Sequence, residues 1–289
     1  MQVEFKSEMQ NFPPPSKTYG MAIIANDKII NWLLPFLESY LATNAATPLY
    51  LIPYDDNVAL TQRAADIYGI HFVEPDSAEL DALAKRLYPM FPGYRRRLRK
   101  FLSLALPLDE VIYLDVDIIL FRDFREMFGR LEAGKNDFIV AAPTKDYVYN
   151  KKRGDYDFLR DVMLFNDGFF VASKEILSLK DFQDVIDKDE AIFHAVRQRG
   201  MLFAQPVTNF VAHRKGLKIT SLRECLPGAS GESFYKAEGV TFDAEGPRDV
   251  FGDKIYFAHW AGAVNLPSRR VFDAAWRQFA NQAAARMKV

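Results

Sequence analysis

The chain of 289 residues contains a single cysteine, Cys225, which excludes an internal disulfide and leaves no second thiolate for a zinc site. Its formal net charge of -1 shows no basic excess, which argues against a nucleic-acid binder that works by neutralising phosphates. The start of the chain, 1–17, holds two glutamates and three consecutive prolines, so we expect neither a signal peptide nor a membrane anchor there. These features predict a cytoplasmic protein whose membrane contact is at most peripheral.

A glycine-rich phosphate loop is also absent after the first expected strand, 19–25. Gly20 lies at the start of this strand and not after it, so neither the dinucleotide fingerprint nor the P-loop is present. Strands and helices nevertheless alternate, with strands expected at 19–25, 48–54 and 70–73 and helices ending near 42, 68 and 88. Such alternation predicts a mostly parallel sheet with helices on both faces, in an α/β chain long enough for one large domain.

The most informative stretch is the apolar run 111–121, which contains two carboxylates, Asp115 and Asp117. An almost unbroken run rich in β-branched residues predicts one strand buried on both faces. Side chains alternate along an extended chain, so both carboxylates should project to the same side. Two like charges this close are costly unless a divalent cation such as magnesium or manganese lies between them. The alternative is that one aspartate caps a turn and the other is solvated.

A basic helix, 94–102, leads directly into this run. Arg96 and Lys100 lie one turn apart and share a face. Their position just before an anionic metal site favours a clamp for a phosphate or a carboxylate, whereas either residue alone would be read as a solvated surface charge.

The second half of the chain loses the regular alternation. A strand at 162–172 is interrupted by Asn166-Asp167-Gly168, which predicts a close backbone approach to a ligand or a bulge. The segments 144–160 and 226–252 are expected to be long loops. A helix is expected at 173–179.

The end of the chain has a last expected strand, 254–258, followed by His259. A lone histidine in such a place is more often a hydrogen-bonded core residue than a ligand. An amphipathic helix is expected from 269 to the end.

Five motifs follow one another in order: Tyr113-Leu114-Asp115-Val116-Asp117, Phe165-Asn166-Asp167-Gly168, Asp189-Glu190, Asn209 and His259-Trp260-Ala261-Gly262. In this order they resemble the motifs of GT-A-fold glycosyltransferases, most of all the retaining family 8, which includes glycogenin-like and galactosyltransferase-like enzymes. The resemblance implies a mostly parallel mixed sheet flanked by helices, with a C-terminal helix. It also divides the chain into an N-terminal arm (1–18), a catalytic domain (19–265) and a C-terminal helix (266–289). Within the catalytic domain, 19–121 would be the nucleotide-binding half and 122–265 the sugar or acceptor half.

The resemblance implies a hexosyltransferase-type enzyme that moves a sugar, with retention, from a nucleotide-diphosphate sugar to an acceptor hydroxyl. Manganese or magnesium would be held by Asp115, Asp117 and His259. The residues at the positions that contact the donor in the family would be Ala25, Asn26, Arg96, Lys100, Val116, Asn166, Gly168 and Gly262. Of the two basic residues, Lys100 is preferred to Arg96 as the donor contact. Asp189 and Glu190 match the region that grips the transferred sugar and are the candidate catalytic residues. The acceptor (glycan, lipid or protein) and the oligomeric state, a homo-oligomer included, stay open.

Two departures from the family pattern stand out. After His-x-x-Gly the family has a lysine that reaches the diphosphate, whereas this chain has Asn265-Leu266-Pro267, so that either Arg269 or Arg270 takes over this contact or diphosphate binding is weaker. Asp167 replaces a usually small residue.

Two other classes of function remain as alternatives. A haloacid dehalogenase-type phosphatase also uses Asp-x-Asp after a strand, but it places the motif on its opening strand. A protein with this fold can also bind a nucleotide sugar without transferring it.

Overall fold

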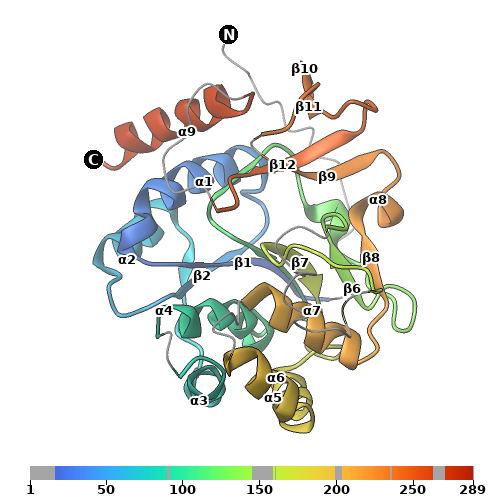
Figure 1. Cartoon of the computed structure of the whole chain (residues 1–289). Coiled ribbons are helices and arrows are strands. Elements are labelled where there is room, and N and C mark those ends of the chain that lie inside the picture. The colour runs from blue at the N-terminus through green and yellow to red at the C-terminus, as the bar shows by residue number, and fades with distance from the viewer. Residues whose placement is uncertain are drawn as a thin grey trace.

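The computed structural model describes residues 17–89, 92–144, 159, 161–198, 204–234, 236–262 and 271–288. Within these residues the strands form two sheets (Figure 1). The larger sheet contains, in spatial order, β3 (His71–Phe72), β2 (Leu49–Pro53), β1 (Tyr19–Ala25), β4 (Glu110–Leu114), β7 (Phe169–Ala172), β6 (Phe138–Val140) and β8 (Ile219–Ser221). The smaller sheet contains β10 (Thr241–Asp243), β11 (Gly246–Arg248), β12 (Lys254–His259) and β5 (Ile118–Leu120), with β9 (Ala229–Phe234) also paired to β12.

The helices have the following bounds: α1 (Ile30–Thr43), α2 (Ala59–Tyr68), α3 (Ala78–Leu87), α4 (Pro92–Arg95), α5 (Leu179–Lys188), α6 (Glu190–Gln198), α7 (Ala204–Arg214), α8 (Leu222–Cys225) and α9 (Asp273–Arg286). The 3-10 helices within the described residues are η1 (Asp27–Ile29), the longer η2 (Arg96–Ala105) and η3 (Arg125–Met127). None of the helices in the described ranges combines the length and the apolar character needed to cross a membrane.

The larger sheet is mostly parallel. β1 pairs in parallel with both β2 and β4, β2 with β3, and β6 with β8, whereas β7 runs antiparallel to β4 and β6. Alternate residues of β1 pack into different cores: Ala22 lies in the one built with α3, η2 and α7, and Met21 in the one built with α1 and α2. A sheet that is covered on both faces explains why β1, and β4 after its first residue Glu110, are apolar. The expected fold class, a mostly parallel mixed sheet with flanking helices, is confirmed.

The run 111–121 is not the single strand that the sequence predicts. β4 ends at Leu114 in the larger sheet, and β5 begins at Ile118 in the smaller sheet, where it pairs antiparallel with β12. Asp115, Val116 and Asp117 form the bend between them. Buried strands leave no room for two uncompensated carboxylates, so the chain changes sheets where the acids occur. The two acids therefore lie where the sheets meet, next to the end of β12.

The basic segment 94–102 is helical as expected, but it is the end of α4 followed by the 3-10 helix η2. Three other local predictions are wrong. The segment 226–252, expected to be a loop, contains β9, β10 and β11. The helix expected at 173–179 begins only at Leu179, and the strand expected from 162 begins at Phe169. β9 is mostly polar and is defined by its pairing with β12, which a local pattern does not reveal. The segment 144–160 lies outside the described residues except for 144 and 159.

The C-terminal helix α9 packs on α1, as Figure 1 shows in red and blue. Near its end, the Arg286 guanidinium donates to the buried carboxylate of Glu38 on α1 at 2.6 Å and 3.2 Å. The same carboxylate accepts a hydrogen bond from the Tyr68 hydroxyl on α2. An ionic contact therefore joins three helices on this side of the sheet.

Candidate active site

The ends of strands from both sheets surround one cavity. Its volume is about 750 Å³, and it lies beyond β1 and β4 of the larger sheet and β12 of the smaller sheet. Parallel α/β sheets bind ligands at such strand ends. Eight of the residues predicted to bind the metal or the donor line this cavity: Asn26, Lys100, Asp115, Val116, Asp117, Asn166, His259 and Gly262.

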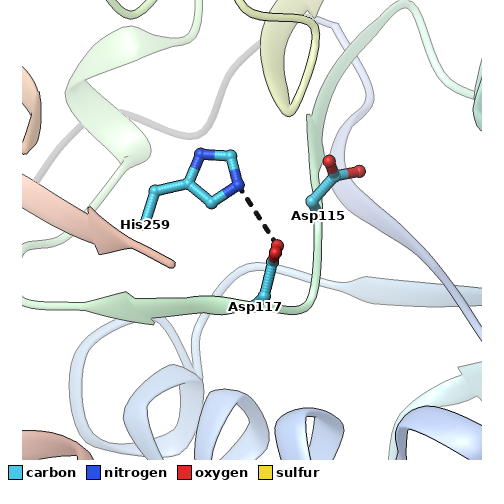
Figure 2. Close-up of side chains that lie close together, drawn as sticks. All are labelled: Asp115, Asp117 and His259. Atoms are coloured by element: carbon cyan, nitrogen blue, oxygen red, sulfur yellow. Dashed lines mark ion pairs between the residues drawn. The ribbon is translucent and has the colours of Figure 1, made fainter. Parts of the chain in front are cut away.

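Asp115, Asp117 and His259 form a cluster at this cavity (Figure 2). One possible ligand atom from each residue lies within 4.8 Å of the other two, and His259 Nε2 is 3.2 Å from Asp117 Oδ1. The cluster is held by the sheet itself, because His259 is paired with Ile118 of β5 and Trp260 N donates to the carbonyl of Asp117. Two carboxylate oxygens and an imidazole nitrogen suit manganese or magnesium. The three residues therefore fit a divalent cation.

A second buried acid orients the histidine. Glu232 on β9 contacts His259 Nδ1 at 2.5 Å, and both side chains are almost fully buried. This contact leaves Nε2 facing Asp117, in the arrangement that metal-ligating histidines commonly have. Burial opposes a charge on the ring, but Asp117 and Glu232 outweigh it and raise the pKa of His259 well above its usual value. Without a metal, the imidazole therefore carries a proton between two carboxylates.

The two aspartates have opposite electrostatic environments. Burial raises the pKa of Asp115, although the Lys100 ammonium opposes this shift. Burial also acts to raise the pKa of Asp117, but the charge and hydrogen bond of His259 lower it below its usual value. A divalent cation bound between the two carboxylates would favour the ionised form of both.

Gly168 brings the backbone of a third segment against the cluster. A Cβ atom placed on it would lie 2.6 Å from His259 Cε1 and 2.9 Å from Asp115 Oδ2. Its carbonyl accepts a hydrogen bond from Asp115 N at 2.7 Å, and its own N–H donates to Asn166 Oδ1. The close approach expected at 166–168 is therefore an approach to the cluster itself.

Two of the other predicted donor contacts are set back from the cavity. Ala25 is fully buried in β1, and Arg96 does not line the cavity but forms an ion pair with Asp55 at 3.0 Å. Asp55 also accepts a hydrogen bond from the Asn26 side-chain amide. Arg96 thus acts on the lining residue Asn26 through Asp55.

The predicted catalytic acids are not brought to the cavity. Asp189 forms an ion pair with Arg214 at 2.9 Å, Glu190 forms one with Arg86 at 3.1 Å, and neither residue lines the cavity. Their place at the start of α6 is explained by these pairs and by the helix dipole. The role assigned to them from the resemblance has no geometric basis at this cavity.

Gln205 is a lining residue that the sequence prediction missed. It lies in the first turn of α7, and its Nε2 atom is buried without a hydrogen-bond partner among the described residues. Four residues later, Asn209 holds α7 against the chain before Gly168 by exchanging hydrogen bonds with the backbone of Phe165. Asn209 belongs to the motifs that carry the family resemblance. Gln205 lies one helical turn before it and shares its face of the helix, and this spacing was the signal that could have found Gln205.

Three cationic lining residues were also missed: Lys28, Arg97 and Lys236. Asp167, noted above only as a departure from the family pattern, lines the cavity too; it is 4% exposed and is paired with Lys100. Arg269 and Arg270, expected near the diphosphate, lie outside the described residues.

The fold is that of GT-A-type glycosyltransferases. Among similar solved structures, LgtC, a galactosyltransferase crystallised with donor and acceptor sugar analogues, aligns with a TM-score of 0.56 at 16% identity over 92% of this chain and 95% of its own. GlyE from Streptococcus pneumoniae aligns with a TM-score of 0.54 at 13% identity, and the bifunctional WbbM with 0.55 at 11%. This chain spans 63% of the GlyE chain and 52% of the WbbM chain.

A second LgtC structure is an active-site mutant in which glutamate replaces a glutamine; it aligns with a TM-score of 0.58 at 15% identity. No family model matches the sequence, and no curated protein matches it. At these identities the likeness establishes the fold.

We predict that Gly168→Ala weakens manganese binding at least about tenfold, because the added methyl group forces His259 or Asp115 out of position. Titration calorimetry measures the effect. Gly93→Ala is the matched control, because a Cβ there meets no atom within 4 Å and its manganese affinity should equal that of the wild type. Equal affinity in both variants would contradict the predicted crowding.

We also predict that manganese binding releases a proton. The raised pKa of His259 means that the free ring is protonated at neutral pH, and a protonated ring cannot coordinate. Affinity should therefore fall by up to about tenfold per pH unit as the pH drops below the raised pKa, and should level off above it. Calorimetry in buffers of different ionisation enthalpy counts the proton. A pH-independent affinity between pH 6 and about 8 would argue against His259 as a ligand.

Proposed function

We propose that the protein transfers a sugar from a nucleotide-diphosphate sugar to an acceptor hydroxyl, with manganese or magnesium held by Asp115, Asp117 and His259. The observation that carries the proposal is the cluster of these three residues at a cavity that strands of both sheets form. The glycosyltransferase fold of the neighbouring structures supports sugar transfer as the class of reaction.

The charges that line the cavity suit a diphosphate leaving group. Cleavage of the glycosyl–phosphate bond builds negative charge on the departing diphosphate, and a bound divalent cation would stabilise that charge as a Lewis acid. Lys28, Arg97, Lys100 and Lys236 line the same cavity and add positive charge around the phosphates. The cationic side chains thus complement an anionic donor without the lysine that the family has after Gly262.

The lining residues favour retention. Among the described residues that line the cavity, the carboxylates are Asp115, Asp117 and Asp167. The first two belong to the metal cluster, and Asp167 is engaged by Lys100 and Thr208. None of these acids is available as a base for the acceptor hydroxyl. A same-face transfer, in which the departing diphosphate takes the acceptor proton, needs no such base.

Gln205 is our candidate for the residue beside the reacting sugar. Its buried, unpartnered amide N–H₂ can donate to a sugar hydroxyl or ring oxygen, whereas a neutral amide is a poor nucleophile. A glutamine is also the mutated active-site residue of LgtC. We therefore place Gln205, in preference to Asp189 and Glu190, at the sugar and give it a positioning role.

A phosphatase of the haloacid dehalogenase type is disfavoured. In that class the first aspartate is a nucleophile on the opening strand, whereas Asp115 follows the fourth strand and faces Lys100 and the metal cluster. A protein that binds a nucleotide sugar without transfer remains as the second candidate, and it shares the same cavity.

We predict that UDP or GDP binds only with manganese or magnesium, because the two aspartates repel a diphosphate when no cation lies between them. Asp117→Asn should abolish the metal-dependent part of binding, and Asp184→Asn, exposed on α5, should not. Calorimetry with and without a chelator measures the nucleotide affinity, and equal affinity in both conditions would contradict the proposal. A panel of donor sugars then separates transfer, phosphate release and binding alone.

We predict that Gln205→Ala lowers the transfer rate by about 10–100-fold, while nucleotide affinity in the presence of manganese changes by less than about threefold. The amide would act on the sugar and not on the diphosphate, so kcat should fall without a matching loss of binding. Gln183→Ala, on α5 and away from the cavity, is the control. An unchanged kcat in Gln205→Ala would place the reacting sugar elsewhere.

A further inference from the structure

Asp167 is a buried carboxylate that lines the cavity outside the metal cluster. Its Oδ1 lies 3.0 Å from Lys100 Nζ, and its Oδ2 accepts a hydrogen bond from the Thr208 hydroxyl on α7 at 2.7 Å. A carboxylate that is only 4% exposed is stable only when its charge is compensated in this way. Asp167 is therefore fixed through both of its oxygens.

Lys100 lies between this carboxylate and the metal ligand Asp115. Its Nζ is 2.9 Å from the carbonyl oxygen of Asp167 and 3.0 Å from Asp167 Oδ1, but 3.6 Å from Asp115 Oδ1. Both short contacts are to Asp167, so the ammonium is held closer to Asp167 than to Asp115, with which it keeps only the longer ion pair. With an exposed fraction of 5%, Lys100 has little solvent to compensate its charge in any other position.

Asp115 has to keep its negative charge available to bind a cation. Its side chain is one-third exposed, and its Oδ1 already accepts a hydrogen bond from the Tyr113 hydroxyl at 2.7 Å. An ammonium and a divalent cation compete for the same carboxylate, because each neutralises the charge that attracts the other. The position of Lys100 therefore decides how much of the charge of Asp115 is left for the metal.

We propose that Asp167 is a positioning residue for the metal centre: by holding Lys100, it keeps the ammonium from neutralising Asp115. The inference rests on the proposed function, because it requires a divalent cation at Asp115, Asp117 and His259. Without the Asp167 charge, Asp115 becomes the remaining acidic partner of Lys100 within the described ranges. The uncompensated ammonium would also repel the cation. Both effects lower metal affinity.

Asp167→Asn tests this directly, since it preserves the shape of the side chain and removes its charge. Manganese alone, without nucleotide, is titrated into the full-length protein, and the free ion is followed by electron paramagnetic resonance. Affinity should fall by about 10–100-fold, the range typical of losing an outer partner of a metal site. Asp243→Asn, on strand β10, changes the net charge equally and should leave the affinity unchanged.

The double variant Lys100→Met/Asp167→Asn distinguishes the mechanism. It removes the competing ammonium together with its counter-ion, so manganese affinity should return to within about threefold of the wild type. The single variant Lys100→Met tests the opposite change, removal of the ammonium while the Asp167 carboxylate is kept. It also provides a test if Asp167→Asn does not fold. Affinity should equal or exceed that of the wild type, because the ammonium that competes for Asp115 is gone, while Thr208 still donates to Asp167.

Three results overturn the inference: Asp167→Asn binds manganese as tightly as the wild type, the double variant is as weak as Asp167→Asn, or Lys100→Met alone loses affinity. In each case Asp167 does not act by holding Lys100. Absence of manganese binding by the wild-type protein overturns the proposed metal site, and this inference with it. The wild-type titration thus tells the two failures apart.

Discussion

The structure depends on how two adjacent carboxylates are kept charged where two sheets meet. Asp115 directly follows β4 and Asp117 directly precedes β5, so the two strands fix the positions of both acids. Each has one basic partner, Lys100 for Asp115 and His259 for Asp117. Each basic partner has in turn a buried outer acid, Asp167 or Glu232. Charges therefore alternate outward from the cluster in both directions, which is the arrangement that buried ionic groups require.

This alternation also fixes the surrounding backbone. His259 is the last residue of β12 and Glu232 lies within β9, and these two strands of the smaller sheet pair in parallel. Lys100 lies on η2, against the larger sheet. The segment that carries Asp167 is held by Thr208 through its side chain and by Asn209 through the backbone of Phe165. Helix α7 therefore positions both the outer acid and Gln205. The ion pairs of the site thus join elements that are far apart in the sequence.

The predictions from sequence succeed where the signal is local. Strand β1 and the end of α2 at Gly69, which has a φ of 64°, follow from apolar runs and a glycine C-cap. The break in 111–121 could not be predicted, because an apolar run does not say which sheet each half joins. The resemblance to a family motif pointed to Asp189 and gave no indication of Gln205, because the lining of a cavity depends on tertiary packing. The pairing of Asp167 with Lys100 joins residues 67 positions apart.

The two outer acids have similar geometry and opposite consequences. Glu232 and Asp117 raise the pKa of His259, so the ring is a better electron donor once deprotonated but holds a proton that the metal must displace. Asp167 acts on Lys100, which is not a ligand, so its hold on the ammonium leaves Asp115 free for the metal. The difference arises from the basic group between each pair of acids. An imidazole can lose its charge and coordinate, whereas a buried ammonium between two carboxylates keeps its charge and has to be held aside.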